Sequence, residues 1–143
     1  MKKIDDVLIN KITSIRKCVA RAREDYAFDE KNFATNFTQQ DSAILNVNRA
    51  CEQSIDLANH IVKLYKLGVP NEARDSFNIL AKSKIIDEDL AQKMGKMIGF
   101  RNISIHEYEK LNIDIVIEVI TKKIDDLLLF TDVILEQQKK LNF

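Results

Sequence analysis

Residues 38–64 read TQQDSAILNVNRACEQSIDLANHIVKL and contain neither glycine nor proline. Their apolar side chains recur every three or four residues, the spacing that places them on one face of an α-helix. Thr38 followed by Asp41 resembles a capping box with Asp in place of the usual Glu, so we expect the helix to begin there. Gly68 and Pro70 follow in the order typical of a helix C-terminus. The stretch therefore predicts one long amphipathic helix.

The remaining sequence predicts further helices on both sides of this one. Asp75 or Ser76 is suited to cap a short helix, Asp87 begins another, and Asn112 can cap the last. Residues 32–38 read as a loop. The expected helices span about residues 4–25, 38–64, 75–82, 87–106 and 113–140.

The last helix has an ambiguous pattern. Ile113, Ile115, Ile117 and Val119 alternate like a β-strand, but no partner strand is recognisable elsewhere, so we interpret the segment as helical. On a helix its apolar residues cover an arc of about 200°, wider than the ~100° stripe of a one-sided surface helix. The surplus could face a second subunit, or the helix could be central in a bundle.

The composition favours an all-α fold. Only three Gly and one Pro occur in 143 residues, 45% of which are hydrophobic, so we expect one globular domain over residues 1–143. Twenty-two basic residues balance twenty-two acidic ones, which removes the broad basic surface of a protein that coats nucleic acid. Cys18 and Cys51 stand apart and are expected to be reduced and buried.

Targeting and membrane signals are missing from the sequence. Asp5 and Asp6 follow Met1-Lys2-Lys3 before any apolar run, unlike a signal peptide, and no apolar stretch approaches the ~20 residues that cross a bilayer. We expect a cytoplasmic protein with no membrane association.

A chemically suggestive group of side chains lies late in the chain. Of the two histidines, His60 sits among apolar neighbours and is best explained as a structural residue. His106 instead follows Arg101, Asn102 and Ser104 within about two helical turns. Asn102 and His106 are four residues apart and share a face, and the long Arg101 side chain can reach around the helix.

These residue types suit cleavage of an RNA phosphodiester. An imidazole can take a proton from a ribose 2′-hydroxyl or give one to the leaving oxygen, and a guanidinium can hold the phosphate. No set of residues has recognisable metal-ligand spacing, so we expect neither a metal nor another cofactor. Acid and base are usually two groups, and a symmetric homodimer would supply the second histidine.

The motif Arg101-x4-His106-x-Tyr108, late in a helical chain, resembles the RX4HXY signature of HepT toxins in the HEPN superfamily. Similarity extends to the stretches Asp41–Asn46, Arg49–Glu52, Asp56–His60, Leu67–Pro70 and Arg74–Phe77. The resemblance covers nearly the whole chain and implies an antiparallel HEPN-type bundle of about four long helices plus a short one.

The resemblance also implies an activity and a partner. HepT-like proteins are metal-independent endoribonucleases that act as dimers, with Arg101 matching the residue that binds the scissile phosphate. Asn102 would orient the phosphate or the histidine, and His106 would be the acid/base. The usual partner is MntA, a nucleotidyltransferase antitoxin that transfers AMP to the motif tyrosine, here Tyr108.

The spacing adds two expectations about neighbouring residues. Tyr108 lies seven residues after Arg101, so it projects from the same side if the helix persists, and a tyrosyl-AMP could occupy the cleft as an RNA mimic. Glu52 and Asp56 form an i,i+4 carboxylate pair that could be catalytic, but we expect them to pair with Arg49 or another cation. Glu52 and Ser104 remain possible supporting residues of the site.

Two other functions compete with the nuclease. One is a non-catalytic HEPN module that binds a nucleotidyltransferase or a nucleotide, and the other is a helical adaptor whose motif residues only cap and pair. No base-reading module is recognisable, so the sequence favours no particular RNA target.

Overall fold

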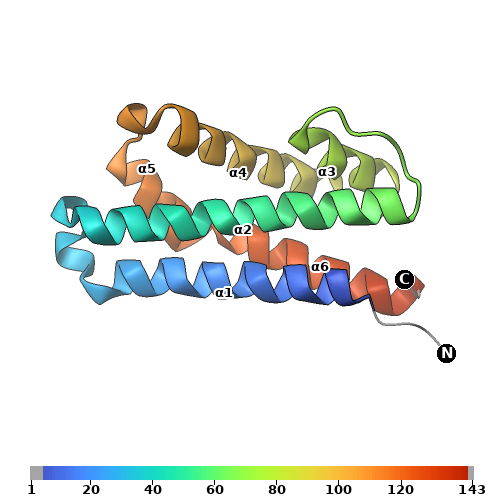
Figure 1. Ribbon diagram of the computed structural model, residues 1–143, viewed down its shortest axis with the longest axis horizontal. Helices are drawn as coiled ribbons and strands as arrows, with labels where there is room; N and C mark the ends of the chain where they lie inside the picture. The colour runs from blue at the N-terminus through green and yellow to red at the C-terminus, as the bar shows by residue number, and fades with distance from the viewer. Residues whose placement is uncertain (1–4, 142–143) are drawn as a thin grey trace.

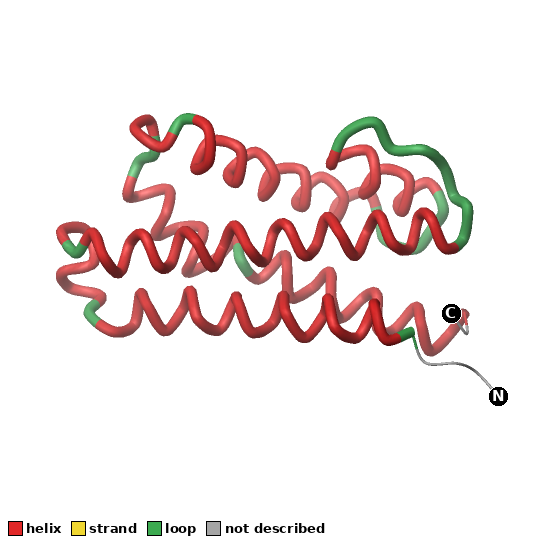
Figure 2. The backbone as a smooth tube through the Cα atoms, viewed as in Figure 1, coloured by secondary structure: helices red, strands yellow, loops and turns green. Residues whose placement is uncertain are grey.

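The computed structural model describes residues 5–141, and within this range all regular structure is helical (Figures 1 and 2). The α-helices are α1 (Asp6–Phe28), α2 (Phe37–Leu64), α3 (Ala73–Lys82), α4 (Glu88–His106), α5 (Ile113–Glu118) and α6 (Asp125–Leu141). Between them lie two 3-10 turns, η1 (Glu30–Thr35) and η2 (Tyr108–Lys110), and a π-helical segment, η3 (Val119–Lys123). The all-α prediction is confirmed, with a second short α-helix beyond the one expected.

α2 is the helix around which the others pack. Figure 1 shows α1 and α2 running side by side in opposite directions, and α2 also contacts α3, α4 and α6. The buried apolar side chains form one continuous cluster. Three fully buried phenylalanines anchor it, and the rings of Phe77 in α3 and Phe130 in α6 meet edge to face with centroids 5.2 Å apart.

The ends of α2 differ from the prediction. Its N-cap is Asn36, whose side chain accepts a hydrogen bond from the Gln39 amide at 3.2 Å, so the helix begins before Thr38. Most of the expected loop is the turn η1, which buries Phe33 against the core. The prediction of an irregular loop was therefore wrong, because this segment forms a 3-10 turn around a buried aromatic ring.

The C-terminus of α2 does not use its glycine. The residue in the left-handed conformation is Lys66, at φ 51°, and the Leu67 amide donates to the Val62 carbonyl at 2.9 Å. This is a Schellman motif. Gly68 lies beyond it, so the expectation that this glycine closes the helix was wrong.

Two other caps were predicted correctly and one was not. Asp87 accepts from the Leu90 amide at 2.7 Å, and Asn112 accepts from the Asp114 amide at 2.8 Å. The α3 helix instead has Glu72 at its N-cap, in a capping box with Asp75. Asp75 therefore belongs to the box, three residues inside the cap.

The segment with strand-like alternation is helical, as predicted, but not uniformly α-helical. The segment η3 is π-helical, so its backbone hydrogen bonds span five residues where those of an α-helix span four. The Ile124 amide, for example, donates to the Val119 carbonyl at 2.8 Å. Val116, Val119 and Ile120 are buried, whereas Ile115 is 49% exposed. The wide apolar arc is therefore only partly covered within this chain.

No helix among the described residues combines the length and apolar content needed to cross a bilayer.

Candidate active site

The motif residues from Arg101 to His106 occupy the last two turns of α4. Ser104 is buried on the side facing α2, whereas Asn102, Ile105 and His106 are exposed. α4 ends at His106, where the Glu107 amide donates to the Ile103 carbonyl at 2.8 Å. The helix end therefore presents an amide and an imidazole to solvent beside a guanidinium.

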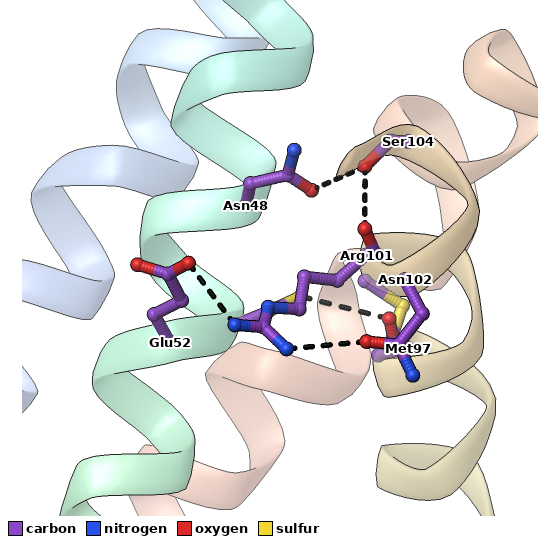
Figure 3. Close-up of polar contacts among 7 residues, drawn as sticks. Asn48, Glu52, Met97, Arg101, Asn102 and Ser104 are labelled. Carbon is purple, nitrogen blue, oxygen red and sulfur yellow. Dashed lines mark hydrogen bonds and ion pairs between the residues drawn. The ribbon is translucent and has the colours of Figure 1, made fainter. Parts of the chain in front are cut away.

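The Arg101 side chain reaches from α4 toward α2. Its Nη2 lies 3.3 Å from Glu52 Oε1, and its Nη1 donates to Asn102 Oδ1 at 3.1 Å (Figure 3). Nε is buried and has no hydrogen-bond partner among residues 5–141. Because 27% of the side chain is exposed, the terminal nitrogens remain accessible to an anionic ligand.

Ser104 holds α4 against α2. Its hydroxyl lies 2.9 Å from Asn48 Oδ1 and 2.9 Å from the Arg101 carbonyl, so the proton can be donated to either acceptor (Figure 3). The residue is 5% exposed. This geometry suits a packing role, in which Ser104 supports the site without reaching the substrate.

The histidines lie in different environments. His106 is exposed and makes no hydrogen bond or ion pair within residues 5–141. His60 lies on α2, with Nε2 2.7 Å from Asp5 Oδ2 at the start of α1. The expectation that His60 has a structural role agrees with this contact.

Tyr108 does not continue the helix that carries Arg101. It lies in η2, so the seven-residue rotation argument, which required a persistent helix, does not apply. Its hydroxyl instead donates a short hydrogen bond to Asp41 on α2. This hydrogen bond, with a contribution from burial and from the Asp41 charge, raises the pKa of the Tyr108 phenol above its ordinary value.

Three α2 side chains therefore face the motif: Asp41, Asn48 and Glu52. They contact Tyr108, Ser104 and Arg101 respectively. Glu52 was predicted as a possible supporting residue, whereas Asp41 and Asn48 were not predicted as partners. The signal was present, because spacings of seven and four residues place all three on one helix face.

The carboxylates Glu52 and Asp56 are both paired, as expected, although not with Arg49. Glu52 contacts Arg101, and Asp56 lies 3.3 Å from Lys11 Nζ on α1. Among the described residues, no group of three or more His, Cys, Asp or Glu side chains could hold a metal ion.

Both cysteines are free and buried, as predicted. Cys51 lies on α2, with Sγ 3.8 Å from the Met97 carbonyl of α4. Burial raises the pKa of its thiol to about 12, although the positive charge of Arg101 opposes this effect. The thiol is therefore protonated at neutral pH and serves as packing.

Comparison with known proteins assigns the chain to a family. Residues 11–134 match the sequence model of the Ribonuclease HepT-like family, and the chain belongs to this family. It is 44% identical to the mRNA nuclease HepT of Shewanella oneidensis over 131 residues, which cover 92% of this chain and 98% of that protein.

Solved structures agree with this assignment. A tri-AMPylated Shewanella oneidensis HEPN toxin in complex with an MNT antitoxin matches with a TM-score of 0.88 and 44% identity, covering 93% of this chain and 99% of that one. A toxin–antitoxin complex with AMP-PNP also gives a TM-score of 0.88, at 43% identity over 92% of this chain and 99% of that one. YutE of Bacillus subtilis, 16% identical with a TM-score of 0.79 over 99% of this chain and 96% of that one, shares the fold.

Proposed function

We propose that this protein is an endoribonuclease toxin that cleaves RNA without a metal and is silenced when a nucleotidyltransferase antitoxin adds AMP to Tyr108. The observation that carries the proposal is the end of α4, where exposed His106 and the accessible guanidinium of Arg101 occupy consecutive turns. The nuclease and antitoxin complexes named for the relatives support it.

The residues of the site divide the chemistry between them. Arg101 would bind the scissile phosphate, exchanging its contact with Glu52 for the phosphate oxygens. The 2′-oxygen of the ribose attacks phosphorus and the 5′-oxygen leaves. A neutral His106 imidazole accepts the proton of the 2′-hydroxyl, and a protonated one donates to the leaving oxygen. Asn102 holds the guanidinium in position through its side-chain oxygen.

We place two copies of the site in one homodimer, because a single subunit offers one suitable histidine. Ile105 is 44% exposed and lies on the α4 face between Arg101 and His106, so a twofold contact there would bring both motifs together. A toxin that acts on cellular RNA would work in the cytoplasm.

The position of Tyr108 supports silencing by AMP. Its side chain is 47% exposed and follows the motif helix by two residues, so a transferase can reach the phenol. The phosphodiester of a tyrosyl-AMP would introduce a negative charge next to the motif and compete with RNA for Arg101.

A cleavage assay in EDTA tests the nuclease. Purified protein should cut single-stranded RNA in EDTA, whereas Arg101→Ala and His106→Ala should lose cleavage and keep the helical circular dichroism of the wild type. His60→Gln is the matched histidine control and should retain activity. Full activity in either motif variant, or no cleavage by the wild type, would overturn the nuclease and leave the binding module.

Adenylylation has a separate test. The wild type co-expressed with a cognate nucleotidyltransferase should gain the mass of AMP, and Tyr108→Phe should remain toxic without gaining it. An AMP increment on the phenylalanine variant would exclude Tyr108 as the acceptor.

A further inference from the structure

Arg74 of α3 lies across two glycines of α4. A Cβ atom at Gly99 would stand 3.2 Å from Arg74 Nη2, and one at Gly95 would stand 3.9 Å from Nε. Arg74 is exposed, and within residues 5–141 its guanidinium forms no hydrogen bond or ion pair. The glycines thus make room for a cation that no protein carboxylate neutralises.

The two glycines share a face of α4 with Asn102 and His106, whereas Arg101 leaves the helix on the side of α2. At about 100° per residue, Gly95, Gly99, Asn102 and His106 fall within about 60° of one another. Gly99 and His106 are separated by a rise of about 10 Å. At the ~3.4 Å rise per nucleotide of one strand in a duplex, that separation spans about three nucleotides. Arg74 is therefore placed for a phosphate about three nucleotides from the scissile one.

A surface hollow surrounds this guanidinium. Its volume is about 360 Å³, and it is lined by Arg74, Asn78, Ala91, Gln92, Gly95 and Lys96. The lining offers two cations, two amides and two small residues, and includes no carboxylate. Such a set binds an anion with hydrogen-bonding oxygens, and the amides can also bond a sugar or a base.

We propose that this hollow between α3 and α4 is a phosphate subsite for the RNA strand, with Arg74 as its principal ligand. The proposal rests on the function proposed above, because it directs the strand along the α4 face toward His106. Its chemistry is that of a backbone contact, which strengthens binding without selecting sequence.

Arg74→Ala tests the subsite through substrate length. For a single-stranded RNA several nucleotides long, KM should rise about tenfold with kcat little changed. For an RNA dinucleotide, which ends before the hollow, the rise should be much smaller. Arg21→Ala, which removes the same charge from the exposed face of α1, should behave as the wild type. Equal losses on both substrates, or a result matching Arg21→Ala, would overturn the subsite.

Gly99→Ala separates a binding role from a structural one. The added methyl meets Arg74 Nη2 at 3.2 Å, so the guanidinium must shift by a few tenths of an ångström without a change in charge. Alanine favours a helix over glycine, so the thermal midpoint should hold or rise while KM for the longer RNA increases. If KM increased only because the fold was damaged, the thermal midpoint would be lower than that of the wild type.

Binding to catalytically inactive protein distinguishes failure of the subsite from failure of the nuclease. In a His106→Ala background, adding Arg74→Ala should weaken binding of a labelled single-stranded RNA and reduce the salt dependence of log Kd by about one. If the wild type cleaves nothing but this reduction is observed, the subsite holds and the nuclease fails. An unchanged salt dependence would refute the subsite whatever the cleavage assay shows.

Discussion

Arg101 is held by a carboxylate in the resting protein. Glu52 lies 3.3 Å from its Nη2, on a side chain that is 47% exposed, and competes with any phosphate for the guanidinium. Glu52 also places a negative charge where the RNA backbone must approach. It therefore positions Arg101 while opposing substrate binding.

Glu52→Gln separates these two effects. The amide keeps a hydrogen-bond acceptor but removes the charge, so KM for RNA should fall by about two- to fivefold, the range expected for a partly exposed ion pair. Steady-state cleavage at low ionic strength measures the change. A collapse of kcat would show instead that the carboxylate is needed to orient Arg101 for catalysis.

Tyr108 and Asp41 form the second polar contact between the motif region and α2. The hydrogen bond stabilises the protonated phenol and raises its pKa. The folded protein therefore gains stability from this contact at pH values below the ordinary pKa of tyrosine. That stability is lost as the pH rises through the raised pKa. This pH dependence is opposite to that of a carboxylate in a salt bridge, which loses its stabilising effect as the pH falls.

Asp41→Asn should lower the pKa of Tyr108 toward its ordinary value of 10. The measurement is the tyrosinate absorbance during an alkaline titration, with Tyr108→Phe subtracted to remove the signals of Tyr26 and Tyr65. An unchanged titration of Tyr108 would mean that the contact with Asp41 does not persist in solution.

At the scale of the elements, sequence reasoning succeeded where the pattern was local. Caps such as Asp87 and Asn112 depend on a side chain and the next few amides, so the sequence contains the whole interaction. The end of α4 at His106 was also predicted, but the contact between Tyr108 in η2 and Asp41 on α2 joins residues that are distant in sequence. Local periodicity cannot reveal that contact.

The π-helical segment η3 was unpredictable for a related reason. Its pattern of hydrophobic residues fits a continuous helix and contains no sign of the register change, which occurs where Val119 and Ile120 are buried. The two lysines with left-handed backbone conformation were also not predictable. Schellman motifs at Lys66 and Lys84 place lysine at a position where glycine is usual. The nearby Gly68 directed the prediction to the wrong position.

Lys66→Gly should stabilise the protein. A left-handed conformation strains a residue with a Cβ, so glycine there should raise the free energy of unfolding by about 0.5–1 kcal/mol. Urea denaturation measures this free energy of unfolding. As a control, Lys17→Gly in the middle of α1 should lower the free energy of unfolding by about 1 kcal/mol. Destabilisation by Lys66→Gly would show that the lysine side chain contributes more than its backbone strain costs.

At the scale of the whole molecule, Asp5 joins two helices. It caps α1 through the Leu8 amide at 3.1 Å and contacts His60 of α2. Burial raises the pKa of Asp5, but the His60 hydrogen bond, the Leu8 amide and the imidazole charge outweigh it, so the net pKa is lowered. The resulting stability is present above the ordinary value of 3.8 and is lost as pH falls through the lowered pKa.

Asp5→Asn isolates this pH-dependent part, because asparagine caps helices about as well as aspartate. Near neutral pH the variant should be less stable by about 1 kcal/mol. On acidification from about pH 6 to pH 3, its free energy of unfolding should fall less steeply than that of the wild type. Parallel curves would show that the contact with His60 carries no net stability.

The proposed homodimer gives the remaining prediction at this scale. Ile105→Asp places a charge on the exposed motif face without disturbing the core, so the chain should remain helical but become monomeric and lose RNA cleavage. Light scattering and the cleavage assay measure the two effects. A variant that is monomeric and fully active would show that one subunit suffices for catalysis.

The two buried thiols make the native protein a convenient host for site-directed labelling. Cys51 has almost no thiolate near neutral pH, and Cys18 is 8% exposed, so alkylating reagents and peroxide should react slowly with both. A cysteine introduced at a surface position would then carry a spin label or fluorophore alone. Distances across the proposed homodimer could be measured without first replacing either native sulfur.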